Sequence, residues 1–409
     1  MNPTDFAIPA EEFTDRRRRF AALLRERDLP AALVWSKGGG NVDLHGPVYY
    51  FSNHYTPFPQ LEDNPPHWSG RAHSALIVTA DGAGILISDI PDYRADLVSA
   101  DEVRVSLDVP AAAVAALRAY SVTGGRIGLI ARDTMLAGAY ERLKGALPGA
   151  EWVPCEDLFG EVRMIKSPNE IRVIRKACEI GSKTCVALME AVRPGRTEAE
   201  VMAEALYVLT REGGMLYDHP VASGPHSRHY AYGRLPSWDH YRKLEEGDIF
   251  HVDMYGAFEG YYYDFGRSTV AGGTATAAQK DVLEAPIAAV EASIAAIRPG
   301  ATAAQVARAG FAWLTEHGFR IAGTKEELDA EGEAALNMSF PSMGHGLGMW
   351  WENPWLVPDD DTVLRPGMVI AVERAVGRWG AGSASYEDDV LVTEDGCEVL
   401  TPVRKRWWS

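Results

Sequence analysis

The chain is poor in cysteine, in long apolar runs and in basic charge. Four of its 409 residues are cysteines (Cys155, Cys178, Cys185 and Cys397), without any CxxC spacing. Such sparse cysteine excludes a disulfide scaffold and is typical of a protein kept reduced in the cytoplasm. No apolar run approaches the roughly 20 residues of a membrane-spanning helix, and the N-terminal segment carries charge and proline where a secretion signal has an apolar core. We therefore expect a cytoplasmic protein that does not cross a membrane.

Basic residues are outnumbered, with 40 Lys and Arg against 57 Asp and Glu, for a formal charge of −17. This balance argues against binding nucleic acid or an anionic membrane surface, since both partners attract basic faces. The expected partner is instead a small molecule. Solubility explains most of the acidic excess; the alternative for some of these carboxylates is metal binding.

The length predicts two domains. Residues 1–160 alternate helical and strand patterns and predict an α/β domain with a mixed sheet. Its expected elements are a helix at 11–27, a strand at 30–36, a hairpin over 74–89, a helix at 110–120 and a strand at 126–130. Residues 38–71 are irregular and rich in aromatic residues, and we expect them to cover a site in this subunit or in a partner's.

The second predicted domain, residues 161–409, contains an internal repeat. RPGRTEAEV at 193–201 resembles RPGATAAQV at 298–306, an offset of 298 − 193 = 105 residues. Each copy has a capping-box pattern, Thr197 with Glu200 and Thr302 with Gln305. The repeat predicts two similar halves related by pseudo-symmetry, with a site in the cleft between them. The alternative is that both segments merely share the residues that begin a helix.

Carboxylates interrupt strand-like segments in this domain. Asp253 and Asp264 flank a turn near 258–260, and a symmetric hairpin would place them directly opposite each other. Opposed side chains have Cβ atoms about 4.5–5.5 Å apart, so the two charges repel unless a cation lies between them or one is protonated. The alternative is a pair of solvated aspartates.

Three further residues strengthen the metal interpretation. His345 lies in the glycine-rich segment GHGLG, Glu373 ends the apolar strand VIAVE, and Glu387 begins another strand. An acid in an apolar strand is costly unless it is paired or binds metal. Two Asp, two Glu and one His suit two divalent ions, such as Mn, Fe, Co or Zn.

The order and spacing of these five residues resemble the pita-bread metallopeptidase superfamily, which includes methionine aminopeptidase, prolidase, aminopeptidase P, creatinase and some dimethylsulfoniopropionate lyases. The segments RMIKSPNEI, VASG, LEEGD, LRPGMVIAVE and EDDVLVTEDG fit the same family. The resemblance covers essentially the whole chain. It implies an N-terminal creatinase-like α/β domain, a C-terminal pseudo-symmetric α+β catalytic domain, a homodimer and a dinuclear metal centre, with Glu387 bridging the metals.

The chain departs from the peptidases of this family at three places. Prolidase-like members carry a second His seven residues after the first; Glu352 stands there, or Trp351 if one residue is deleted. Their Arg two residues before the last Glu is Ser385, and a third His is replaced by Pro236 unless an insertion lets His229 or His240 substitute. These losses favour chemistry other than peptide hydrolysis, and Glu352 resembles the acidic residue that the lyases carry in this stretch.

Aromatic residues gather around the same segments. We expect them to hold a cationic substrate group, because ring faces attract onium ions; plain core packing or an interface is the alternative. A general base would be Glu352 or the tyrosinate of Tyr386, within reach of the substrate's proton. The predicted substrate contacts are Trp350, Trp351, Trp355, Tyr263, His229 and Trp238.

The leading functional prediction is a metal-dependent lyase of a small zwitterionic metabolite, with cleavage of dimethylsulfoniopropionate to dimethyl sulfide and acrylate as the specific example. The first alternative is an Xaa-Pro dipeptidase or aminopeptidase P-like hydrolase in which Glu373 shuttles a proton. Others are hydrolysis of a C–N bond in a creatine-like or cyclic amidine substrate, and a metal-bound interaction protein without catalysis.

Overall fold

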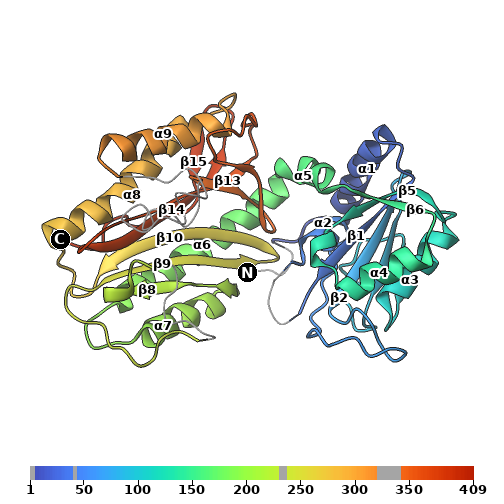
Figure 1. Ribbon diagram of the computed structural model, residues 1–409, viewed down its shortest axis with the longest axis horizontal. Coiled ribbons are helices and arrows are strands. Elements are labelled where there is room, and N and C mark those ends of the chain that lie inside the picture. The colour runs from blue at the N-terminus through green and yellow to red at the C-terminus, as the bar shows by residue number, and fades with distance from the viewer. Residues whose placement is uncertain (1–4, 40–43, 230–236, 320–341) are drawn as a thin grey trace. The chain divides into compact units, whose positions relative to one another are not determined.

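A computed structural model describes residues 5–39, 44–229, 237–319 and 342–409 (Figure 1). The chain divides into two compact units, Met1–Arg163 and Met164–Ser409. The boundary expected from sequence, between residues 160 and 161, lies three residues earlier. Within the described ranges, no helix combines the length and apolar character needed to cross a membrane.

The first unit is built on one mixed sheet with the strand order β4-β3-β2-β1-β5-β6. Its centre is β1 (Ala31–Lys37), antiparallel to β2 (His73–Thr79) and parallel to β5 (Gly125–Ile130). Apolar side chains of the sheet and of two helices form its core. The other elements are α1 (Ala10–Glu26), α2 (Gly46–Ser52), β3 (Gly84–Ser88), β4 (Glu102–Val105), α3 (Val109–Ala119), η1 (Arg132–Thr134), α4 (Ala137–Ala146), β6 (Ala150–Pro154) and α5 (Glu156–Met164).

The segment 38–71 is less irregular than expected, because α2 lies within it. Tyr50 and Phe51 of this helix are buried, and their carbonyls accept hydrogen bonds of 3.0 and 2.8 Å from the buried guanidinium groups of Arg16 and Arg17. These aromatic side chains thus belong to the core of their own unit. Residues 40–43 lie outside the described residues, and a covering role for the segment stays a prediction.

The second unit repeats one arrangement of helices and strands. Two helices precede an antiparallel hairpin in each half: α6 (Pro168–Ala191) and α7 (Glu198–Arg211) before β9 (Ile249–Phe258) and β10 (Tyr261–Val270), then α8 (Ala277–Ala296) and α9 (Ala303–Glu316) before β13 (Val369–Arg378) and β14 (Gly382–Val392). β10 packs beside β14 (Figure 1). The remaining elements are β7 (Met215–Asp218), β8 (Val221–Ser223), η2 (Gly224–His226), β11 (Gly344–Leu347), β12 (Trp351–Trp355) and β15 (Cys397–Val399).

The repeated sequence begins the second helix of each half. Thr197 and Thr302 each accept a hydrogen bond from the backbone N–H three residues on, and the side chain found there returns one, so both capping boxes form. The glycine before each box donates its N–H to a leucine that begins the hairpin segment, Gly195 to Leu244 at 2.8 Å and Gly300 to Leu364 at 3.0 Å. Matching long-range contacts support two related halves better than shared capping residues alone.

The register of the first hairpin differs from the symmetric one expected. Asp253 pairs with Gly266 and Asp264 with Tyr255, so the two aspartates are diagonal neighbours on one face. The turn lies at Glu259 and Gly260, whose φ values of 47° and 78° suit a tight two-residue hairpin. The assumed turn centre was one residue too early, and this moved the expected pairing by two positions.

Candidate metal centre

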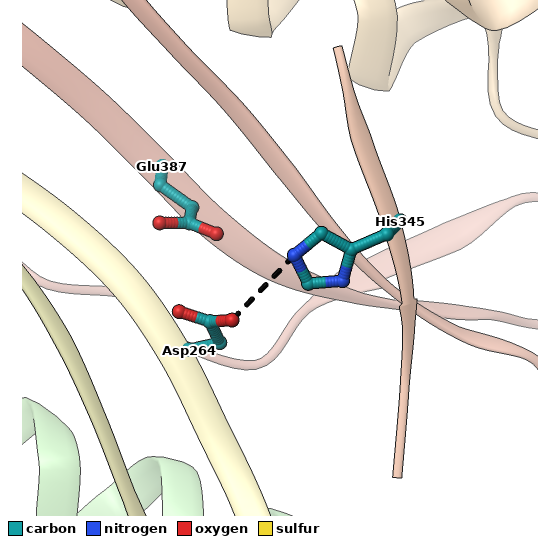
Figure 2. A group of neighbouring side chains, drawn as sticks. All are labelled: Asp264, His345 and Glu387. Carbon is teal, nitrogen blue, oxygen red and sulfur yellow. Dashed lines mark ion pairs between the residues drawn. The ribbon is translucent and has the colours of Figure 1, made fainter. Parts of the chain in front are cut away.

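The five predicted ligands come together in the second unit as two overlapping groups. Asp264, His345 and Glu387 form one, and Asp253, Glu373 and Glu387 form the other. Within each group the candidate ligand atoms lie within 4.8 Å of one another, and Glu387 belongs to both. Figure 2 shows the first group, with the His345 imidazole and the Asp264 carboxylate turned toward each other. We call these five residues the acidic cluster.

Strand register brings the acidic cluster together. Glu373 of β13 lies directly opposite Glu387 of β14. His345 of β11 reaches the cluster from the other side of β13, next to Gly344. That glycine has φ 131°, and a Cβ there would lie 1.9 Å from the carbonyl oxygen of Ala371, so the close approach of β11 to β13 requires glycine.

The charges in the acidic cluster oppose one another. Burial and the nearby Asp253 raise the pKa of Glu373 to about 8. Burial, followed by the neighbouring carboxylates, raises the pKa values of Asp264 and Glu387 well above their usual range. Burial lowers the pKa of His345 to about 4, so its imidazole is neutral near pH 7 and can donate a lone pair. Such a donor set fits divalent cations, which offset the repulsion.

Burial also excludes the solvated-aspartate alternative for the deeper group. Asp264, His345 and Glu387 are each no more than 4% exposed. The Glu373 side chain retains 28% exposure, and its Oε1 lies 3.8 Å from His345 Nε2. The acidic cluster thus has a buried side at Asp264 and a partly exposed side at Glu373.

Glu352, predicted as a general base, is turned away from the acidic cluster. It forms a buried ion pair with Lys166, each side chain being 2% exposed. Its neighbour Trp351 faces the ligands, because adjacent residues of a strand point to opposite faces: the Trp351 indole N–H donates to Asp264 Oδ2 at 2.5 Å. Of the two residues considered for the second histidine's place, Trp351 is therefore the one beside the ligands.

Two predicted tyrosines belong to the core rather than to the acidic cluster. Tyr386 is 1% exposed, packs in the apolar core and donates its hydroxyl to Asp388 at 2.7 Å. Burial raises its pKa, which opposes a role as tyrosinate base. Tyr263 is fully buried, lies close to Gly181 of α6 and has its hydroxyl 3.1 Å from His219 Nε2. Tyr386 is adjacent to Glu387 in the chain and Tyr263 is adjacent to Asp264, so each tyrosine points to the opposite face of its strand.

The aromatic rings that do approach the acidic cluster form a continuous set. Trp351 and Trp355 lie 5.6 and 5.3 Å from the His345 ring, and Trp350 lies 5.1 Å from Trp351. Three tyrosines extend the set at ring distances of 5.0–5.8 Å, and two of them, Tyr217 and Tyr255, were missed by sequence reasoning. We call the set the aromatic wall; its members are Tyr217, Tyr255, Tyr262, Trp350, Trp351 and Trp355.

The loop residues predicted to touch substrate have other contacts. The Trp238 indole donates to the carbonyl oxygen of His219 at 2.9 Å. The His229 Nε2 accepts from its exposed neighbour Arg228 at 3.2 Å. Nothing in these contacts joins either residue to the acidic cluster, and Pro236 lies outside the described residues.

One buried acid behind the cluster was also missed. Asp389 is fully buried, and its Oδ2 accepts from the backbone N–H of Asp264 at 3.0 Å and from the Cys178 thiol at 3.4 Å. Burial raises its pKa well above the usual range. Its position two residues after Glu387 on the same strand face was the available signal.

Comparison with known proteins identifies the family. The model of metallopeptidase family M24 matches residues 172–394, and that of the creatinase/prolidase N-terminal domain matches residues 16–165. The chain belongs to metallopeptidase family M24. Its two-domain α/β architecture is therefore confirmed, as is its place in the creatinase and prolidase branch of the pita-bread enzymes.

Several relatives of this M24 chain carry peptidase names. It is 29% identical over 289 residues to an Xaa-Pro dipeptidase of Pyrococcus horikoshii, covering 70% of this chain and 76% of that one. It is 31% identical over 280 residues to the putative dipeptidase YkvY of Bacillus subtilis, covering 68% and 71%. The crystal structure of the Pyrococcus horikoshii prolidase superposes with a TM-score of 0.75 at 23% identity, covering 96% of this chain and 99% of that one.

These relatives correct the leading functional prediction. They support an enzyme that is a hydrolase of family M24, a family that uses divalent metals, and they do not support the lyase. The dipeptidase alternative fits them better. The lyase prediction rested on three departures from the family pattern, whereas the shared ligand set favours a hydrolase.

Proposed function

We propose that this M24 chain is a hydrolase that uses two divalent metal ions to cleave the peptide bond of Xaa-Pro dipeptides. The observation that carries the proposal is the pair of three-residue groups that share Glu387. The names of the relatives support the substrate class. The N and O donors suit Mn, Fe, Co or Zn.

The acidic cluster would supply both the metal ligands and a group that moves protons. Asp253, Asp264, His345, Glu373 and Glu387 would hold the two ions, and Glu387 belongs to both three-residue groups. Bound ions of this kind polarise the scissile carbonyl and activate a water molecule. Glu373 is the member of the set suited to move a proton, because its side chain keeps 28% exposure whereas Asp264 and His345 are buried. Its carboxylate would take a proton from the attacking water and pass it to the leaving nitrogen.

The aromatic wall would form the substrate side of the site. Trp350, Trp351 and Trp355 remain partly exposed, whereas Tyr255 and Tyr262 are buried behind them. Rings of this size supply apolar contact area and favour flat or cationic groups. We propose that the three indoles contact the dipeptide, whose proline ring presents an apolar face. Substrate contact by His229 and Trp238 remains a prediction, and so does the homodimer.

Parallel activity assays test the proposal. The metal-stripped protein is loaded in turn with Mn²⁺, Fe²⁺, Co²⁺ or Zn²⁺ and offered Xaa-Pro dipeptides, matched Xaa-Ala dipeptides and dimethylsulfoniopropionate. We expect metal-dependent release of proline and no dimethyl sulfide. Glu373→Gln should lower turnover at least about 100-fold, the usual cost of one catalytic group, whereas Glu394→Gln, at an exposed turn, should not. Dimethyl sulfide without proline release would refute the proposal.

A further inference from the structure

A hydrogen bond between Asp389 and the backbone of Asp264 joins the two halves of the second unit at the acidic cluster. Asp389 Oδ2 accepts the Asp264 N–H at 3.0 Å. The acceptor belongs to β14 of the second hairpin, and the donor belongs to β10 of the first. Glu387 lies two residues before Asp389 on the same strand. One side chain therefore ties a member of the acidic cluster from the first half to the strand that carries a member from the second.

The place of β10 in its sheet explains why this bond matters. β10 stands at the end of the strand order β10-β9-β7, and β9 is the strand that pairs with it. An edge strand presents N–H groups that no neighbouring strand accepts. Asp264 is only 2% exposed, so leaving its N–H unpaired would be costly. The Asp389 carboxylate takes the place that a neighbouring strand would fill.

The acceptor is itself held by several contacts. Asp389 is fully buried, and the Cys178 thiol of α6 donates to the same Oδ2 at 3.4 Å. Its backbone N–H donates to Thr401 Oγ1 at 3.1 Å, and its carbonyl oxygen accepts the Leu400 N–H at 2.7 Å. Groups presented from fixed strands hold a site more precisely than groups on loops. Asp389 thus offers the backbone of Asp264 a fixed point of attachment.

The bond leaves the Asp264 side chain available to a cation. It uses the backbone N–H, whereas the carboxylate of Asp264 belongs to the group with His345 and Glu387. Because residues two apart share a face of a strand, Asp389 and Glu387 both face β10. The same bond therefore sets the spacing between Asp264 and Glu387. Partners that orient metal ligands in this way typically contribute about 10- to 100-fold to metal affinity.

We propose that Asp389 is a positioning residue: by accepting the Asp264 N–H, it holds the acidic groups of the two hairpins at the spacing that bound metal ions require. The inference rests on the proposed dinuclear centre. It predicts that metal affinity depends on a hydrogen-bond acceptor at position 389.

Calorimetric titration of the metal-stripped full chain with Co²⁺ tests this inference. Asp389→Val keeps a short side chain and removes the acceptor, so the Co²⁺ concentration at half-saturation should rise about 10- to 100-fold. Asp389→Asn keeps an oxygen that can accept the N–H, and its half-saturation should stay within about threefold of the parent. At saturating Co²⁺, the visible absorption should differ from the parent's in Asp389→Val and match it in Asp389→Asn.

Two controls separate positioning from general destabilisation. Val390→Ala removes buried methyl groups from the next residue of β14, which packs in the apolar core. Cys178→Ala removes the other donor to Asp389 and leaves the bond to the Asp264 N–H in place. Both variants should keep half-saturation by Co²⁺ within about threefold of the parent.

Hydrogen exchange supplies a test that needs no variant. In the metal-free parent, the Asp264 amide should exchange about as slowly as the amide of Tyr262, which donates to the carbonyl oxygen of Gly348 at 2.8 Å on the same strand edge. Exchange of the Asp264 amide at the rate of an exposed amide would show that the bond is absent and overturn the role.

The outcomes distinguish this inference from the proposed function. If the parent binds two ions and Asp389→Val binds them as tightly, the positioning role is wrong and the dinuclear centre stands. Equal weakening in Asp389→Val and Asp389→Asn, or in Asp389→Val and Val390→Ala, also overturns the role. A parent that does not bind two ions overturns the dinuclear centre and the role together.

Discussion

Neutralising Glu373 should stabilise the metal-free protein. The pKa of this group rises from 4.5 to about 8 on folding. At about 1.4 kcal/mol per unit, the difference corresponds to on the order of 5 kcal/mol. This is an upper limit for Glu373→Gln, because the carboxyls of Asp264 and Glu387 titrate against the same charges.

The direction of the pH dependence follows from this raised pKa. Between about pH 4.5 and 8 the folded protein keeps a proton on Glu373 that the unfolded chain has lost, so the free energy of unfolding falls as the pH rises. Above about pH 8 the folded protein has lost this proton too, and the free energy of unfolding no longer falls on account of Glu373. Glutamine carries no charge, and Glu373→Gln should show a smaller decline.

Urea unfolding in excess chelator, followed by circular dichroism at pH 5, 6.5 and 8, measures this decline. At pH 8 the free energy of unfolding should be about 2–5 kcal/mol higher for Glu373→Gln than for the parent, and unchanged for Glu394→Gln. With saturating metal the order should reverse, because the variant has lost a ligand. A metal-free variant no more stable than the parent at pH 8 would refute the reasoning.

Three other substitutions test separate parts of the structure. Lys166→Met leaves the charge of Glu352 buried and should cost about 3–5 kcal/mol, measured by urea unfolding; recovery in the double variant with Glu352→Gln is expected, and equal loss in both would contradict the ion pair. Gly344→Ala places a Cβ 1.9 Å from a carbonyl of β13 and should lower both the melting temperature and the metal content, whereas Gly396→Ala, with open space around it, should lower neither. Glu387→Ala should abolish binding of both metal ions in elemental analysis; retention of two would exclude a shared ligand.

Residue spacing was sufficient to find the acidic cluster. The five residues of the acidic cluster could be predicted because each interrupts an apolar or glycine-rich segment where a charge or an imidazole is otherwise costly. The strand pairing of Asp253 and Asp264 could not be predicted in the same way, because a shift of one residue in the turn moves the register by two residues.

It was harder to predict which face of its strand each aromatic side chain occupies. Strict alternation from Asp264 would have selected Tyr262 rather than Tyr263, because residues two apart share a face. The orientation of Glu352 depends on Lys166, which lies 186 positions earlier in the chain. Sequence pattern carries no information on such a distant partner.

Neither hairpin of the second unit carries a complete ligand group. β9 and β10 supply Asp253 and Asp264, while β13 and β14 supply Glu373 and Glu387. In the proposed metal centre, a partly folded chain with one hairpin formed would therefore lack a full set of ligands, and it would capture cations only after both halves have assembled. Metal occupancy of the proposed centre would thus report completed folding. Once bound, the ions tie the halves together, so chelation should raise amide hydrogen exchange in both hairpins at once.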